Sequence, residues 1–238
     1  MARPGDAGLS PLTARAHAFV VDLAAPRLSS GDHHHLARVL RLPPGSEVTV
    51  GDGAGRWRPA RLTGGPEVEP VGDVVADTRP SPPLTVAFAL VKGDRPELVV
   101  QKLTELGVDR IVPFAAERSV VRWDERKADR QAARLSEVAR HAAMQCRRTW
   151  LPQVDRLASF ADVAGLPAAA MADIEGGPPT LAHPTVLVGP EGGWSRAERS
   201  MSLPCVQISG HVLRTETAAV TIGALLSALR SELMTESS

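Results

Sequence analysis

A proline-rich segment, Arg79-Pro80-Ser81-Pro82-Pro83, divides the chain into two parts with different residue patterns. Successive prolines favour extended backbone and cannot donate backbone hydrogen bonds, so neither a helix nor a central strand can run through this segment. Of the 238 residues, 43% are apolar, which is enough to build a packed core. We therefore place a domain boundary here and expect domains over residues 1–79 and 80–238.

The first part is predicted to be mostly β, because it is rich in glycine and proline turns and contains only short apolar runs. A hairpin is expected over residues 47–62, since Gly51-Asp52-Gly53 supplies residues that tolerate positive φ. One short helix is expected from Asp32 to Leu40, with Asp32 as its cap and Pro43-Pro44 forcing its end.

The second part alternates apolar strands with amphipathic helices, which is typical of an α/β fold around a parallel sheet. The nearly unbroken apolar run at residues 84–91 indicates a strand that is buried on both faces. Further strands are expected at 110–114, 185–188 and 206–209, and helices at 96–106, 124–148 and 218–229.

Composition excludes several classes of protein. The 27 basic and 27 acidic residues cancel, and no apolar run approaches the ~20 residues of a membrane-spanning helix. No secretory signal is expected at residues 1–21, because they contain no continuous apolar segment followed by a small-residue cleavage site, and Cys146 and Cys205 are too few for a disulfide framework. His33-His34-His35 suggests a metal site only weakly, because consecutive helical side chains point about 100° apart. We expect a cytoplasmic protein without a membrane segment or metal.

The most informative segment is Leu187-Val188-Gly189-Pro190-Glu191-Gly192-Gly193-Trp194-Ser195, in which a strand runs into a glycine-rich turn. A helix is expected to start at Ser195, with Glu198 completing a capping box. Such a turn at the carboxyl edge of a sheet is where α/β proteins bind ligands. The segment is neither a Walker loop nor a dinucleotide-binding GxGxxG motif. Alone, it would also suit a tight turn without a ligand.

A second segment, Ser209-Gly210-His211-Val212-Leu213-Arg214-Thr215-Glu216-Thr217-Ala218, repeats this pattern of strand, glycine turn and helix start. Thr215 or Thr217 could cap the helix, and a helix N-terminus favours an anion or an electron-rich group. Arg214 is either a structural ion-pair partner of Glu216 or a cation directed into the same cleft.

Charge is uneven along the chain, because residues 118–148 carry nine basic and four acidic side chains. A solvated helix face is the usual explanation of such a run. A local phosphate-binding stripe is the functional alternative. The pattern alone does not decide between them.

Together these segments resemble the SPOUT methyltransferases, in particular the RsmE-type bacterial family that methylates N3 of a uridine in 16S ribosomal RNA. The Gly-Pro-Glu-Gly-Gly turn and the later Val-Leu-Arg-Thr-Glu-Thr-Ala segment carry the resemblance, and other blocks follow in order along the chain. These blocks are His35–Leu42 with Gly45, Val91–Arg95, Gln101–Val108, Glu117–Ser119 and Gln145–Arg148. The chain departs from the family in an Ala- and Pro-rich stretch, residues 160–183, which we interpret as a trimmed loop. It also has Ser209 where leucine is more usual.

The resemblance implies an α/β protein with an N-terminal PUA-like RNA-binding β-barrel domain over residues 1–79 and a SPOUT methyltransferase domain over residues 80–238. The latter would carry a trefoil knot at about residues 185–230. The implied cofactor is S-adenosyl-L-methionine (SAM), the implied RNA partner is 16S rRNA in the small ribosomal subunit, and family members form homodimers. Carried over by position, the cofactor-binding residues are Leu187, Gly189, Gly192, Ile208, Gly210, Leu213 and Thr217.

Methylation of uracil N3 requires that the proton on N3 be removed. Arg214 is a poor base, because a guanidinium stays protonated, so its expected role is to stabilise charge on the uracil oxygens. Glu191 or Glu216 could accept the proton, although a helix-capping ion pair explains Glu216 equally well.

RNA contacts are expected from cations in both domains, although several of them also suit an ordinary surface role. The residues are His35, Arg38, Arg41, Lys92, Arg95, Arg118, Arg147 and Arg148. Two alternatives to rRNA uridine methylation stay open. One is an RNA-binding ribosome-assembly factor without catalysis, and the other is a SPOUT methyltransferase with a different RNA target.

Overall fold

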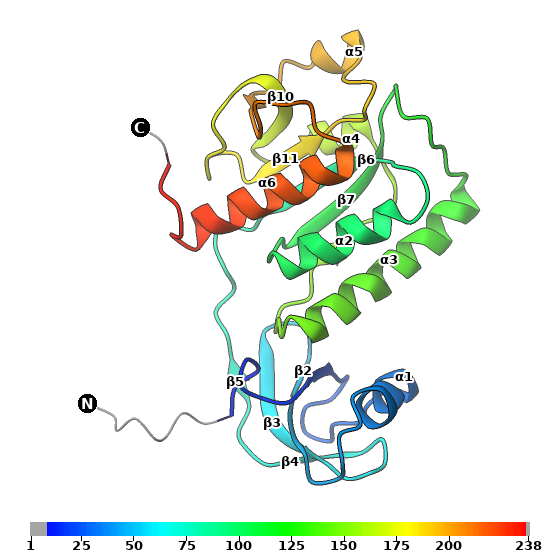
Figure 1. Ribbon diagram of the computed structural model, residues 1–238, viewed down its shortest axis with the longest axis vertical. Coiled ribbons are helices and arrows are strands. Elements are labelled where there is room, and N and C mark those ends of the chain that lie inside the picture. The colour runs from blue at the N-terminus through cyan, green and yellow to red at the C-terminus, as the bar shows by residue number, and fades with distance from the viewer. Residues whose placement is uncertain (1–8, 237–238) are drawn as a thin grey trace. The chain divides into compact units, whose positions relative to one another are not determined.

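The computed structural model describes residues 9–236, which form two compact units (Figure 1). The first unit contains Met1–Arg79 and Ala143–Leu151, and the second contains Pro80–Ala142 and Pro152–Ser238. One border between the units falls at the proline-rich segment. The short return of the chain at residues 143–151 has no counterpart in the two domains that the sequence predicts.

The first unit is built on one mixed sheet. Strands β1 and β2 pair in parallel, whereas β2–β3, β3–β4 and β3–β5 are antiparallel. The antiparallel β2–β3 pair is the hairpin expected over residues 47–62, so that prediction is confirmed. The strands are β1 His17–Phe19, β2 Glu47–Gly51, β3 Arg56–Leu62, β4 Val68–Pro70 and β5 Val75–Ala76.

The helix of the first unit has two parts, the α-helix α1 (Ser30–His34) and a π-helical turn, η1 (His35–Val39). Ser29 is its N-cap, because its hydroxyl accepts a hydrogen bond from Asp32 N at 3.0 Å. The expectation that Asp32 caps the helix is therefore wrong. Asp32 stands three residues inside, where its carboxylate accepts a 2.7 Å hydrogen bond from the Ser29 hydroxyl.

Residues 143–151 belong to the first unit because their side chains complete it. Ala143 and Met144 are buried in its apolar core with sheet residues and Leu36. The Arg147 guanidinium donates hydrogen bonds to the backbone carbonyls of Pro11, Ala14 and Arg15. Arg147 is thus occupied within the unit, which differs from the RNA contact expected for it.

The second unit contains a parallel sheet in the order β12-β10-β11-β6-β7-β8, with β9 also pairing with β7. The chain places β11 between β10 and β6, and β12 on the other edge of β10. The strands are β6 Thr85–Ala89, β7 Arg110–Ala115, β8 Gln153–Val154, β9 Ala158–Ser159, β10 Ala169–Gly177, β11 Thr185–Val188 and β12 Cys205–Val206.

Helices cover both faces of this sheet. On one face, Phe88 and other strand residues share a core with Leu103 of α2 and Leu226 of α6. On the other face, Phe114 packs with Val163 of α4 and with Trp194. Successive strand residues point to opposite faces, and both faces are covered, which explains why β6 is buried at every position. The helices are α2 Arg95–Glu105, α3 Glu125–Gln145, α4 Phe160–Ala164, α5 Arg196–Arg199 and α6 Thr215–Arg230.

The interpretation of residues 160–183 as a trimmed loop is wrong, because this stretch contains α4 and the interior strand β10. Ala169-Ala170-Met171-Ala172 has weak β propensity and no alternating pattern, so the sequence gives little sign of a strand. Two parallel neighbours, β11 and β12, hold it in the sheet. The consequence is functional, because the middle of β10 forms one wall of the cavity described below.

Two observations concern the described part of the chain as a whole. None of its helices has the length and apolar character needed to cross a membrane. No group of three or more His, Cys, Asp or Glu side chains among residues 9–236 is arranged to hold a metal ion.

Candidate cofactor and catalytic site

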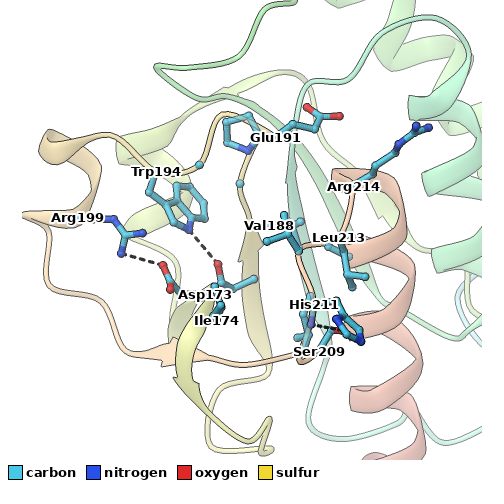
Figure 2. A pocket seen from close by; sticks show the side chains of 17 residues that line it. Asp173, Ile174, Val188, Glu191, Trp194, Arg199, Ser209, His211, Leu213 and Arg214 are labelled. Carbon is cyan, nitrogen blue, oxygen red and sulfur yellow. Dashed lines mark hydrogen bonds and ion pairs between the residues drawn. The ribbon is translucent and has the colours of Figure 1, made fainter.

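A cavity of about 370 Å³ lies beside the carboxyl ends of β10 and β11, where α/β sheets bind ligands (Figure 2). Its size suits a small organic ligand. The walls come from the middle of β10 (172–174), the turn that follows β11 (188–194) and the segment that leads into α6 (208–214). Both glycine-containing turns singled out in the sequence therefore meet at one cavity.

The turn after β11 has the local structure that its sequence predicts. Ser195 is the N-cap of α5, with Glu198 N 3.2 Å from Ser195 Oγ and Ser195 N 2.8 Å from Glu198 Oε2, so the expected capping box is confirmed. Gly193 has φ +68°, a conformation that favours glycine. A Cβ atom on Gly189 would lie only 2.9 Å from the indole ring of Trp194, so this position has no room for a side chain.

Trp194 joins this turn to the middle of β10. Its ring is buried, stacks on Phe114 at a centroid distance of 6.2 Å and donates a 3.0 Å hydrogen bond from Nε1 to the Ala172 carbonyl (Figure 2). Beside it, Asp173 Oδ2 lies 2.9 Å from Arg199 Nη1. The sequence did not single out Asp173 or Arg199. Asp173 lies in the stretch taken for a loop, and nothing in the sequence shows that Arg199 pairs with it.

The segment that enters α6 is tied to the same turn. Arg214 is the N-cap residue, with extended backbone, and α6 begins at Thr215 rather than at residue 218. Neither Thr215 nor Thr217 is the cap. The Thr215 hydroxyl instead donates a 2.9 Å hydrogen bond to the Gly189 carbonyl, which links the start of α6 to the turn after β11.

The candidate catalytic carboxylates meet at a third element, α2. Arg95 Nη1 lies 3.5 Å from Glu216 Oε1 and 3.8 Å from Glu191 Oε1. Arg95 was expected to contact RNA phosphate, and here it pairs with both glutamates. The Arg214 side chain is exposed and forms no ion pair among residues 9–236, so of the two roles left open for it, pairing with Glu216 is excluded. Glu216 Oε2 is buried and has no hydrogen-bond partner in this part of the chain.

Comparison with known families and proteins identifies the chain. The RNA methyltransferase domain family matches residues 79–227, and the RNA methyltransferase PUA domain family matches residues 29–67. The chain belongs to the RNA methyltransferase family. The ribosomal RNA small subunit methyltransferase E of Mycobacterium bovis is 32% identical over 237 residues, covering 86% of this chain and 87% of that protein. The Bacillus subtilis protein of the same name is 28% identical over 212 residues, covering 78% and 82%.

A solved structure of this family has the same fold. It is a ribosomal RNA small subunit methyltransferase E from Neisseria gonorrhoeae bound to S-adenosyl methionine, with 26% identity and a TM-score of 0.77. The match covers 90% of this chain and 97% of that chain. The resemblance to RsmE-type RNA methyltransferases is thereby confirmed.

The cavity of this RNA methyltransferase has the surfaces that SAM requires. Val188, Ile208 and Leu213 give apolar walls for a base, and the buried Asp173 carboxylate gives a polar group for a sugar. The first glycine turn brings its backbone to the cavity without an intervening side chain at Gly189. The residues present therefore fit the cofactor.

The predicted cofactor residues of the RNA methyltransferase divide into two groups. Gly189, Ile208 and Leu213 line the cavity. Leu187 is fully buried in the core on the opposite face of the sheet, so only its backbone can serve a ligand. The others, Gly192, Gly210 and Thr217, are exposed and are not among the lining residues. Ser209, the departure from the family pattern, does line the cavity, and its hydroxyl accepts a 3.0 Å hydrogen bond from His211 N.

The remaining predicted RNA-binding residues have different surroundings. In the first unit, His35, Arg38 and Arg41 are exposed on or just after η1. In the second unit, Lys92 is exposed, whereas Arg118 donates a 3.1 Å hydrogen bond from Nη1 to the Gly192 carbonyl. Arg148 is half-buried in the returning segment of the first unit.

Proposed function

We propose that this protein transfers a methyl group from SAM to N3 of a specific uridine in 16S rRNA of the small ribosomal subunit. One observation carries the proposal: in a chain of the RNA methyltransferase family, both glycine-containing turns, Glu191 and Arg214 border one cavity. The likeness to the Neisseria gonorrhoeae enzyme bound to S-adenosyl methionine supports the cofactor. The names of the Mycobacterium bovis and Bacillus subtilis relatives support the small-subunit rRNA substrate.

The cavity would hold SAM between its three walls, with Gly189, Ile208 and Leu213 in direct contact. Four more residues complete the proposed set through backbone groups or at the rim of the cavity, namely Leu187, Gly192, Gly210 and Thr217. When bound, SAM supplies an electrophilic methyl group carried on a sulfonium. Methyl transfer depends strongly on alignment, so the fixed turn around Trp194 contributes by positioning.

Arg214 would act on the uracil. It is the exposed N-cap of α6, and its guanidinium has no carboxylate partner among residues 9–236, so its charge remains available to a substrate. As N3 loses its proton, negative charge spreads to the two uracil oxygens. A guanidinium donates hydrogen bonds to such oxygens and stabilises that charge.

Glu216 is the better candidate to accept the proton from N3. Its Oε2 atom has no hydrogen-bond partner among the described residues, so a good acceptor is unused. Glu191 has a more exposed side chain, 51% against 13% for Glu216, and lies farther from Arg95. Glu191 then serves as the second carboxylate that holds the Arg95 guanidinium in place.

RNA would be held by both domains. The match of the PUA domain family to residues 29–67 includes the exposed residues His35, Arg38 and Arg41. Phosphate contacts by such cations fix the position of an RNA without reading its sequence. Lys92 and Arg118 of the second unit would serve the same purpose, and so would Arg148 of the first unit. Arg95 and Arg147 contribute less, because their guanidinium groups are engaged within the chain.

Three further parts of the proposal concern architecture and location. A SPOUT trefoil knot at about residues 185–230 is supported by the sheet order, since β12 lies beyond β10 while α6 returns to pack against β6 and β11. The family resemblance supports a homodimer. It also supports action in the cytoplasm, where ribosomal subunits are assembled.

The test is transfer of labelled methyl groups from SAM to small ribosomal subunits that lack the modification, followed by mass-spectrometric mapping of the base. Label on a single uridine, at N3, would establish both the reaction and its substrate. SAM binding without label on this RNA would move the function to another RNA target. Absence of both would favour a ribosome-assembly factor without catalysis.

A further inference from the structure

Asp173 presents a carboxylate at the wall of the cavity that the proposed chemistry does not use. Its side chain is only 5% exposed, and its Oδ2 atom lies 2.9 Å from Arg199 Nη1 (Figure 2). Its Oδ1 atom accepts a 3.2 Å hydrogen bond from Glu175 N. Asp173 follows directly after Ala172, whose carbonyl is held by Trp194. The carboxylate is thus fixed by Arg199 of α5 and by Glu175 of its own strand, and Trp194 holds the residue before it.

This carboxylate has capacity for a ligand. An ionised carboxylate offers about four acceptor positions, and the contacts to Arg199 and Glu175 use two of them. The Asp173 carboxylate is buried, whereas the Arg199 side chain is 52% exposed, and an ion pair with a partly exposed cation contributes little to stability. Burying a carboxylate is costly, so stability alone does not explain this carboxylate at a cavity wall. A role in recognising a ligand does explain it.

The charge of the pair indicates which part of a ligand it recognises. Arg199 neutralises Asp173, so an ammonium group would gain little net attraction there. A neutral hydroxyl donor needs no net charge and gains a charge-assisted hydrogen bond. Vicinal ribose hydroxyls are such donors, and carboxylates bind ribose hydroxyls in other nucleotide-binding folds.

We propose that Asp173, oriented by Arg199, accepts hydrogen bonds from the ribose hydroxyls of the cofactor and so selects a ribonucleoside ligand. This inference rests on the proposed function, because it takes SAM as the occupant of the cavity. The apolar side chains of Val188, Ile208 and Leu213 remain available to the adenine base. Asp173 is therefore a specificity-determining residue of the cofactor site.

The test is calorimetric binding of two probes, S-adenosylhomocysteine and 5′-methylthioadenosine, together with the 2′-deoxy and 3′-deoxy forms of the second. Removing a hydroxyl that the carboxylate binds should weaken binding to the wild-type protein about 10- to 100-fold. In Asp173→Ala, the ribose and deoxyribose probes should bind within about threefold of each other. The readout is the ratio of the Kd of a deoxyribose probe to that of the matching ribose probe, taken within each variant. A general loosening of the cavity changes both Kd values alike and cancels in this ratio.

Two variants accompany this measurement. Asp129→Ala removes a surface ion pair with Arg156 in the same unit, and it should keep the wild-type ratio. Arg199→Lys keeps a cation but loses the planar fork of donors, so its ratio should lie between those of wild type and Asp173→Ala. Circular dichroism identifies any variant that fails to fold. If Asp173→Ala does not fold, the ratio measured for Arg199→Lys decides the question.

Two outcomes would overturn the inference. A wild-type ratio retained in Asp173→Ala would show that the carboxylate does not contact the ribose. If Asp173→Ala loses affinity only for S-adenosylhomocysteine and binds 5′-methylthioadenosine as the wild-type protein does, the contact lies at the amino-acid end of the cofactor. Failure of the proposed function is distinguishable from these outcomes. If SAM is not the cofactor, the wild-type protein would bind neither probe, and if only the RNA target differs, both probes would bind with the expected ratio while 16S rRNA stays unmethylated.

Discussion

Arg95 Nη1 lies 3.5 Å from Glu216 Oε1, so the first residue of α2 is paired with the first turn of α6. The same guanidinium atom lies 3.8 Å from Glu191 in the turn after β11. Three segments that are distant in the sequence therefore share one cation. In the proposed reaction, this pairing fixes the carboxylate that receives the proton from N3, which makes Arg95 a positioning residue.

Arg95→Ala should reduce kcat about 10- to 100-fold while leaving the Kd for SAM within about threefold. The physical reason is that Glu216 loses its partner and its orientation, whereas Arg95 does not line the cofactor cavity. Single-turnover kinetics and calorimetry would measure the two effects separately. Arg156→Ala, which breaks a surface ion pair of the same unit, serves as the control. An equal loss of SAM binding would show that Arg95 supports the cavity instead.

Arg214→Ala should reduce methyl transfer about 100- to 1000-fold, because one donor to a developing negative charge is removed. The affinity for SAM should change much less, since the guanidinium is directed to the uracil in the proposed arrangement. Arg214→Lys keeps the charge without the fork of donors and should recover part of the rate. Equal losses of methyl transfer and SAM binding would mean that Arg214 mainly shapes the cavity.

Local signals in the sequence predict much of this fold. The run at residues 84–91, the hairpin over 47–62 and the capping box of Ser195 and Glu198 each have a periodicity or a spacing that indicates the structure found. The first glycine turn is also evident, because glycine is required at Gly189, where the Trp194 ring approaches the backbone. These features depend on residues close together in the chain.

What the sequence misses depends on contacts between distant residues. Ala-rich β10 is a strand only because β11 and β12 flank it. The sequence therefore does not predict this strand, and it does not indicate that Asp173 lines the cavity. Arg147 looks like an RNA-binding cation until its contacts with the carbonyls of Pro11, Ala14 and Arg15 are known. Arg95 likewise shows its role only beside Glu216. A charged side chain alone does not indicate its partner.

The stability of the first unit should depend on pH through His17. Burial, aided by the nearby Arg147 cation, lowers the pKa of His17 from 6.5 to about 4. The unfolded chain therefore binds a proton below pH 6.5 that the folded chain accepts only below about pH 4. The contribution of neutral His17 to the free energy of unfolding is fully present above pH 6.5. About 2 to 3 kcal/mol of this free energy should be lost by pH 4.5.

Urea unfolding of the full chain at pH 7 and pH 4.5 measures this dependence. His17→Gln does not titrate, and its amide can still bond to Thr49, whose Oγ1 lies 2.9 Å from His17 Nδ1 in the wild-type protein. The variant should lose less stability than wild type between these pH values. His141→Gln, at an exposed residue of α3, should behave as wild type. The same pH dependence in wild type and His17→Gln would assign the effect to other groups.

Gly189→Ala should weaken SAM binding at least about 10-fold, although alanine is the smallest possible addition. The new Cβ would lie 2.9 Å from the Trp194 ring, so the ring must shift and its hydrogen bond to the Ala172 carbonyl must lengthen or break. Overpacking of this kind also costs about 1 to 3 kcal/mol of stability.

Calorimetry and tryptophan fluorescence would follow the binding and the ring, respectively. Gly177→Ala is the matched control, because its Cβ would meet no atom within 4 Å and Gly177 does not line the cavity. Unchanged affinity in Gly189→Ala would mean that the turn after β11 tolerates a displaced Trp194. The cavity walls formed by β10 and by residues 208–214 would then be sufficient to bind the cofactor.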